Sequence, residues 1–366
     1  MATYKANWPE TRQRFTAWWQ GGDTGRPLIN LWVRRATPLS TAEPPPFAND
    51  DERYLSVEKL TAQALAQFSR WEPAAEAYPS LSLNLGAGSM ALYLGSEPEF
   101  RAETVWFEAT LKEYGEALRL DPENRWFARH LAMYRQAAGL LAGTDVVLDI
   151  PDIVENIDIV SALRGPQTLC YDLFDEPEAV HATIRQINEA YPPSYDAFAE
   201  ICRDETGGTA FTFFRIWGPG RTAKVQCDMA AILSPGQFRD FVREPLREQC
   251  RWLNNSLYHL DGPECIVHVP ALMEIAELKA LQWTPGDGKP KSGEECWDDL
   301  YRAVRDAGKG LWVSLEDYDP ETATAKADRL MRKFGANGFY FQMPPMEQHQ
   351  ADALLLLADR HWKTHG

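Results

Sequence analysis

The short stretch SLYHLDG (256–262) places His259 and Asp261 one residue apart, where an apolar run ends in Asp-Gly. Side chains alternate between the two faces of a strand, so both residues would point to the same side if this run is a strand. An imidazole beside a carboxylate can move a proton or help to hold a metal ion. The alternative interpretation is a histidine fixed by hydrogen bonds to the backbone, followed by an Asp-Gly turn.

Polar and aromatic residues also stand at or near the ends of other apolar runs: Arg34, Asp152, Trp217, Arg221, Asp228, Tyr258, Trp283, Glu316 and Gln342. Carboxylates that crowd together repel one another, so some of their pKa values should be raised unless a cation compensates. A raised pKa suits a general acid, and a compensating cation would indicate a metal site. Asp228 could instead cap a helix, and Glu316 could be an acid favoured at a helix N-terminus.

Eight short apolar runs would have to position these side chains: 27–33, 81–85, 145–150, 209–217, 256–260, 278–283, 310–315 and 338–342. Helical patterns separate most of them, as at 56–71, 175–191, 234–255 and 346–362. Near-continuous apolar strands that alternate with helices indicate a parallel sheet buried on both faces.

Eight such strands predict an α/β fold, a single (β/α)8 TIM barrel over residues 1–366 with helical additions at 1–26 and 86–142. The active site of such a barrel lies at the carboxyl ends of its strands, where the polar residues above would meet. A doubly wound sheet is the alternative, but no glycine-rich phosphate loop follows the first strand.

The formal net charge is −16, from 53 acidic and 37 basic residues in a chain of 366. Such a chain is repelled by nucleic-acid backbones and anionic membranes, so neither is expected as a partner. We expect no signal peptide and no membrane span, because the longest apolar runs fall well short of about 18 residues. Six scattered cysteines without a CxxC pair predict reduced thiols in a cytoplasmic protein.

Three segments carry a resemblance to a known family. LRGPQTLCYDLFDEPEAV (163–180) resembles the glycine-proline-threonine-leucine stretch of the uroporphyrinogen decarboxylase superfamily, and INLWVRRATP (29–38) is similar to its first strand with trailing arginines. Residues 225–262 are similar to its Asp, Ser-Pro-helix and final His-x-Asp/Cys-Gly pattern. The resemblance covers residues 27–366. It implies a (β/α)8 barrel with a deep cleft, in a superfamily that holds porphyrinogen decarboxylases and methyltransferases acting with corrinoid proteins.

Two departures from the family patterns bear on the reaction. The decarboxylases carry an aspartate on an early strand, where LSLNLGAGS offers Asn84, so porphyrinogen decarboxylation is not expected. The methyltransferases hold zinc through His-x-Cys and a cysteine near the last strand; here Asp261 replaces the first cysteine and YFQMPP lacks the second. The comparison therefore implies that His259, Asp261 and Glu316 hold zinc or a harder divalent ion, or that no metal is bound.

The leading hypothesis is a methyltransferase-like enzyme acting on a small polar substrate, with a corrinoid protein or a second copy of the chain as candidate partner. The expected catalytic residues are His259, Asp261, Glu316 and Asp228, and the expected substrate contacts are Arg34, Asp152, Trp217, Arg221, Tyr258, Trp283 and Gln342. A carbohydrate-active enzyme that uses two of the carboxylates, with tryptophans stacked on sugar rings, is the alternative. A non-catalytic binding barrel is a third interpretation.

Overall fold

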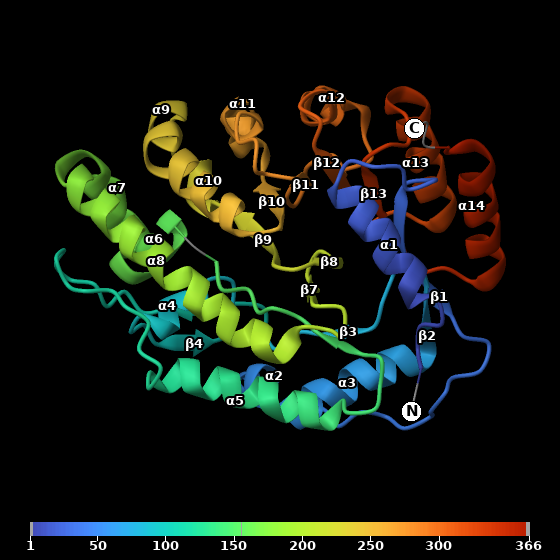
Figure 1. The fold of residues 1–366 in the computed structure, drawn as a ribbon, viewed down its shortest axis with the longest axis horizontal. Helices are drawn as coiled ribbons and strands as arrows, with labels where there is room; N and C mark the ends of the chain where they lie inside the picture. Colours follow the sequence, from blue (N-terminus) through green and yellow to red (C-terminus); the bar gives the residue numbers. More distant parts are fainter. Residues whose placement is uncertain (1–2, 155, 364–366) are drawn as a thin grey trace.

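The computed structural model describes residues 3–154 and 156–363, and its centre is a curved seven-stranded sheet in the order β2-β1-β13-β12-β11-β10-β9 (Figure 1). Neighbours from β1 to β9 run parallel, and β2 at the edge is antiparallel to β1. The strands are β1 (Leu28–Arg34), β2 (Trp71–Ala75), β9 (Thr222–Gln226), β10 (Asn255–Asp261), β11 (Ala280–Thr284), β12 (Gly310–Ser314) and β13 (Phe339–Gln342). The predicted α/β class with a largely parallel sheet is confirmed.

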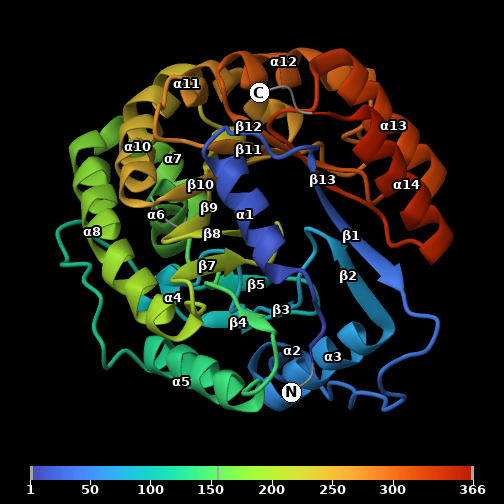
Figure 2. The same ribbon diagram turned by 45° about the vertical axis from the view of Figure 1, so that its right-hand side comes forward.

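Helices connect the strands and surround the sheet (Figure 2). The helical patterns predicted at 56–71, 175–191, 234–255 and 346–362 are confirmed, although the third is interrupted by a π-helical turn at Phe238–Val242. The helices are α1 (Trp8–Trp19), α2 (Asp50–Leu55), α3 (Val57–Arg70), α4 (Met90–Tyr93), α5 (Arg125–Leu140), α6 (Asn156–Arg164), α7 (Pro166–Asp175), α8 (Pro177–Cys202), α9 (Pro235–Gln237), α10 (Arg243–Trp252), α11 (Val269–Met273), α12 (Asp298–Asp306), α13 (Pro320–Phe334) and α14 (Gln348–His361).

Three strand pairs lie outside the main sheet: β3 (Ser80–Leu81) with β6 (Val147–Leu148), β4 (Pro98–Phe100) with β5 (Val105–Phe107), and β7 (Gly208–Phe211) with β8 (Ile216–Pro219). Because β3 and β6 are not paired with the main sheet, the hydrogen-bonded ladder among the described residues is open. The segment 86–142, expected to be helical, holds α4 and α5 together with the β4–β5 pair.

The strand predicted over 209–217 is wrong, because this segment is the antiparallel hairpin β7–β8. The turn that joins its two strands contains no Gly, Pro or Asn. The Arg215 N–H donates to the carbonyl of Thr212 at 2.9 Å and closes this turn. A continuous apolar run does not distinguish one long strand from a hairpin when the turn lacks the usual turn residues. The parallel strand of this region is β9, which the sequence reading missed because Lys224 and Gln226 make TAKVQ polar.

Aromatic side chains fill the sheet interior and bind α1 against the amino ends of the strands. Phe15 and Trp18 of α1 belong to one buried apolar cluster with inward residues of β1, β10, β11, β12 and β13. The Trp18 indole donates to the Gly338 carbonyl at 2.9 Å, just before β13 begins. A Cβ at Gly310 would lie 2.8 Å from the Trp18 ring, so this approach requires glycine. The carboxyl ends of the strands lie opposite the ends against which α1 packs.

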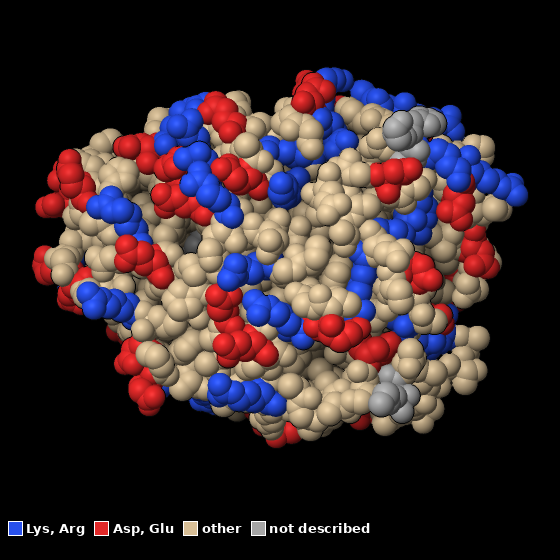
Figure 3. All heavy atoms as spheres, in the orientation of Figure 1, with Lys and Arg blue, Asp and Glu red and all other residues tan. Residues whose placement is uncertain are grey.

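Acidic side chains do not form one continuous patch on the face shown in Figure 3. On the face shown in Figure 3, Lys and Arg side chains are interspersed with Asp and Glu. No helix in the described part of the chain is both long and apolar enough to span a bilayer.

Glu76 ties α1, β1 and the segment before β1 together. It is buried, accepts the Ile29 N–H at 2.7 Å, and forms ion pairs with Arg14 at 2.7 Å and Arg26 at 2.9 Å. Removing one partner of a buried ion pair leaves the other charge without compensation.

We expect Glu76→Gln to lower the free energy of unfolding by about 3 kcal/mol in urea denaturation. The exposed pair of Glu72 with Arg35 provides the control, and Glu72→Gln should cost less than about 1 kcal/mol. Equal losses in the two variants would contradict this role of Glu76.

Candidate active site

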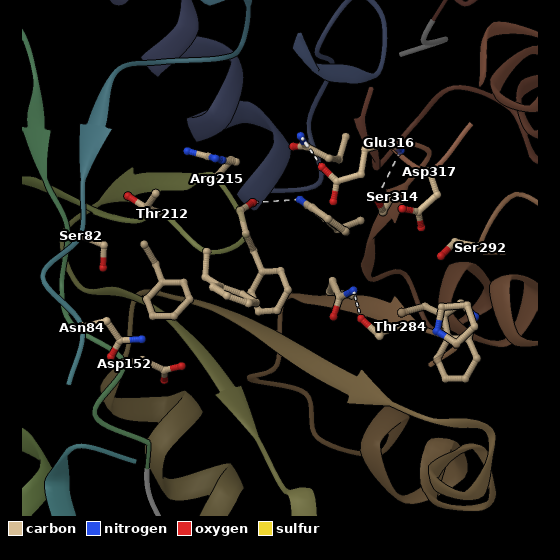
Figure 4. A pocket seen from close by; sticks show the side chains of 18 residues that line it. Ser82, Asn84, Asp152, Thr212, Arg215, Thr284, Ser292, Ser314, Glu316 and Asp317 are labelled. Atoms are coloured by element: carbon tan, nitrogen blue, oxygen red, sulfur yellow. Dashed lines mark hydrogen bonds between the residues drawn. The ribbon is translucent and has the colours of Figure 1, made fainter. Parts of the chain in front are cut away.

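A cavity of about 500 Å³ opens at the carboxyl ends of β11, β12 and β13 (Figure 4). One wall is the hairpin segment 211–215, and another is formed by residues that end or follow these strands. Ser82, Asn84 and Asp152, which follow β3 and β6, complete the lining. Cavities of this size suit small ligands, and the carboxyl ends of parallel strands are the usual place for an active site in α/β folds.

Side chains of two strands hold the hairpin turn in its place on the cavity wall by hydrogen bonds to its carbonyl groups. The indole N–H of Trp312 donates to the Phe214 carbonyl at 2.9 Å, and the Tyr340 hydroxyl donates to the Arg215 carbonyl. The φ angle of Arg215 is +53°, a left-handed conformation that a non-glycine residue adopts only when its surroundings hold it. The Phe213 side chain is 72% exposed on the same segment.

His259 lies beside the hairpin turn, with its ring centroid 5.0 Å from that of Phe214. Gln282 donates to the Thr284 hydroxyl at 2.8 Å and turns its amide oxygen to His259 Nδ1, which assigns the imidazole proton to Nδ1. Burial and then the positive charge of Lys224 lower the pKa of His259 to about 4, so the ring is neutral near pH 7. Its Nε2 lone pair faces Asp261 Oδ2 at 4.0 Å.

Lys224 supplies a buried positive charge to the carboxylates at the cavity. Its ammonium lies 2.7 Å from Asp152 Oδ1 and also donates to the side-chain oxygen of Gln226. Both ion-pair partners are largely buried, whereas Asp152 lines the cavity. The ion pair orients Asp152, so this carboxylate can accept hydrogen bonds from a ligand.

Asp158 and Asp228 form a second carboxyl pair. Asp158 accepts the backbone N–H groups of Asp228 at 2.7 Å and Met229 at 3.1 Å, whereas Asp228 accepts the Gln226 amide at 2.8 Å. Desolvation by surrounding protein, and then the negative charge of Asp158, raise the pKa of Asp228 to about 7. Asp158 has the better donors for an anion, so Asp228 holds the proton. Water still reaches Asp228, which allows proton exchange.

Gln342 and Glu316 meet at the ends of β13 and β12. The Gln342 amide donates to Glu316 Oε2 at 3.3 Å, and both residues line the cavity. Gln342 pairs in register with Ser314 on one side and Asn30 on the other, so polar side chains cross three strands at this level.

Several residues predicted at the site are placed together by the structure. Asp152, Trp283, Glu316 and Gln342 line the cavity, while His259 and Asp228 are connected to its wall through Gln282 and through Gln226 with Lys224. Asp261 adjoins His259, as the strand alternation predicted.

Four predicted substrate contacts lie elsewhere, so these assignments are corrected. Arg221 pairs with Asp196 at 3.2 Å and stacks over Trp252, away from the cavity. Trp217 is buried in the α1 cluster, because β8 belongs to a hairpin rather than to the predicted strand. Tyr258 alternates with His259 and faces the outer apolar core, and Arg34 is exposed at the end of β1 outside the cavity lining.

The predicted metal site is not formed by these side chains. No three His, Cys, Asp or Glu residues within 3–154 and 156–363 are grouped so that they could hold a metal ion. His259 and Asp261 lie in the last three residues of β10, whereas Glu316 follows β12 and accepts a hydrogen bond from the Gln342 amide. The trio His259, Asp261 and Glu316 therefore does not fit zinc or another divalent ion.

Two residues at the site were not among those predicted: Arg215, which lines the cavity, and Lys224, which forms an ion pair with the cavity residue Asp152. Lys224 carries a usable signal, since Thr222, Lys224 and Gln226 alternate with apolar residues as on a strand with one polar face. Arg215 carries none, because its position depends on a turn that no local residue indicates.

We expect Asp228 to titrate near neutral pH in carboxyl-carbon NMR of Asp-labelled protein. Asp158→Asn removes the neighbouring negative charge, so it should move the Asp228 titration to lower pH. Asp196→Asn, which alters a carboxylate paired with Arg221, is the control and should leave the titration in place. An unshifted titration in Asp158→Asn would show that the two carboxyls do not interact.

Comparison with known proteins bears on the fold. No protein-family model and no curated protein matches the sequence. Among solved structures, a methyltransferase from Methanosarcina mazei has a similar fold, with a TM-score of 0.62 and 12% sequence identity. The likeness spans 95% of this chain and 98% of the other. The whole described architecture, rather than one part, therefore has a known counterpart.

Proposed function

We propose that this chain is a methyltransferase-like enzyme of the uroporphyrinogen decarboxylase superfamily, built on a (β/α)8 barrel, that acts on a small polar substrate in the cavity. The observation that carries an enzymatic role is the proton-holding Asp228, joined to the cavity wall through Gln226, Lys224 and Asp152. Similarity over nearly the full length to a methyltransferase supports methyl transfer as the reaction.

In this proposal the carbon–heteroatom bond of an N-methyl or O-methyl substrate breaks, and its electron pair remains on the heteroatom. That atom takes a proton that water carries from Asp228, because Asp228 is exposed to water but lies outside the cavity lining, while the methyl carbon bonds to a nucleophilic acceptor. A reduced corrinoid carried by a partner protein would supply this acceptor. Asp152, held by Lys224, accepts hydrogen bonds from the substrate, and His259 orients the cavity residue Gln282.

Hydrolysis of a glycosidic bond is a second candidate on the same cavity. The exposed ring of Phe213 lines the same cavity as Asp152 and Glu316, and such a combination of aromatic face and carboxylates suits a sugar. Two carboxyls, one protonated and one ionised, also satisfy the acid and base roles of that reaction.

A test that separates the candidates uses free cob(I)alamin as acceptor and a panel of small N-methyl and O-methyl compounds. We expect methylcobalamin to form, as followed by absorbance, and Asp228→Asn to slow the reaction by about 100-fold. Asp240→Asn, at an exposed aspartate far from the cavity lining, should leave the rate unchanged. Release of sugar from aryl glycosides without methyl transfer would replace the leading proposal with the second, and turnover of neither panel would favour a binding protein.

The pH profile should carry the signature of Asp228. A carboxyl with a pKa of about 7 is protonated below that pH, and the acid form is lost as the pH rises through it. We therefore expect kcat/KM to be constant at lower pH and to fall about tenfold per pH unit above 7. The descending limb should move to lower pH in Asp158→Asn. A limb that stays in place in this variant would exclude Asp228 as the titrating acid.

A further inference from the structure

The cavity carries charges of opposite sign on two of its walls, and neither is compensated by a neighbouring side chain. Arg215 lies in the hairpin segment, and no ion pair joins its guanidinium to any residue that the structure describes. Glu316 follows β12, and its carboxylate accepts from the neutral amide of Gln342 and forms no ion pair with a cation among the described residues. Figure 4 shows the two side chains on the upper walls of the cavity, with Ser314 near Glu316.

Two buried amide oxygens also lack hydrogen-bond donors, that of Gln342, which bonds Glu316, and that of Asn30, its register neighbour on β1. A carboxylate only accepts, so the Gln342 amide must turn its nitrogen to Glu316, which leaves its oxygen buried without a partner among the described residues. Asn30 donates to the Tyr340 hydroxyl at 3.3 Å, and its oxygen is likewise buried and unpartnered in the described structure. A buried acceptor without a donor is costly, so this corner is complementary to a group with several N–H donors.

The backbone of Arg215 is held in place by hydrogen bonds, while its guanidinium forms no ion pair with the described residues and can bind an anionic ligand. Its backbone is fixed by the carbonyl of Thr212 and by the Tyr340 hydroxyl, as described above. Burial raises the pKa of Asp149 well above the ordinary value, and the charge of Arg215 opposes this rise. Both carboxyl oxygens of Asp149 lack a hydrogen-bond partner among the described residues, so Asp149 does not bond the guanidinium, whose planar fork suits a carboxylate.

We propose that the cavity takes a small zwitterionic substrate, with a carboxylate bound by Arg215 and an ammonium group bound by Glu316 and the Gln342 amide oxygen. A simple anion would satisfy Arg215 but place negative charge near Glu316 and Asp152, and a simple cation would leave Arg215 unpaired. The inference rests on the proposed function for the statement that such a compound is turned over, and it narrows the small polar substrate to the amino-acid class.

Calorimetric binding of a homologous probe series tests this proposal without turnover. The probes are the ω-amino acids from glycine to 6-aminohexanoate, with pentylamine and pentanoate as partners that lack one of the charges. We expect at least one amino acid to bind about tenfold more tightly than either single-charge probe, because two charge-assisted contacts form rather than one. Equal or tighter binding of pentanoate or pentylamine would overturn the proposal.

Two variants assign the ends of the probe. Arg215→Gln should weaken the best amino acid about tenfold or more and leave pentylamine unchanged, and Glu316→Gln should weaken the amino acid and leave pentanoate unchanged. Arg221→Gln and Glu321→Gln, which alter a charge outside the cavity lining, are the matched controls and should retain wild-type binding. If the amino acids bind as expected but no methyl transfer occurs, the zwitterion site stands and the proposed reaction fails. Methyl transfer from uncharged compounds without amino-acid binding would have the opposite meaning.

Discussion

The site depends on two hydrogen bonds that hold a turn inside the curved sheet. The Trp312 indole and the Tyr340 hydroxyl donate to consecutive carbonyls, those of Phe214 and Arg215, from neighbouring strands β12 and β13. These donors lie on the buried inner face of the sheet, so the carbonyls they bind would otherwise be unsatisfied. With the turn fixed, its phenylalanines separate the apolar interior from the polar mouth. The same contact holds Arg215 in its left-handed conformation on the cavity wall.

Charge in the mouth is distributed so that each carboxyl has a different state. Lys224 compensates Asp152 directly, and backbone N–H groups stabilise an ionised Asp158. Asp228 has one amide donor and a negative neighbour, so it is the carboxyl that carries a proton near neutral pH. Glu316 has only the amide of Gln342. One cluster of acids thus offers an anchored acceptor, a proton donor and an anion without a compensating cation.

The sequence was informative where periodicity is local and uninformative where position depends on distant contacts. Seven of the eight apolar runs each contain residues of one strand, and the eighth, 209–217, contains the two strands of a hairpin. Short runs of β-branched and aromatic residues between amphipathic helices are typical of strands. The alternation in β10 correctly placed His259 and Asp261 on one side. The run at 209–217 misled, since its turn is imposed by Trp312 and Tyr340, more than 90 positions along the chain. That error placed Trp217 and Arg221 in the predicted site and concealed the strand β9 that carries Lys224.

The packing of α1 has a consequence for the order of events at the cavity. Phe15 and Trp18 close the amino end of the sheet interior, and the interior between them and the hairpin turn is solid with aromatic rings. Among the described residues, this packing closes the amino side, so a ligand reaches the cavity from the carboxyl ends of the strands. If the proposed methyl transfer to a protein-borne acceptor takes place there, the small substrate has to enter before the larger acceptor covers it. Product release would then require the acceptor to withdraw, which favours a compulsory order of binding with dissociation as a slow step.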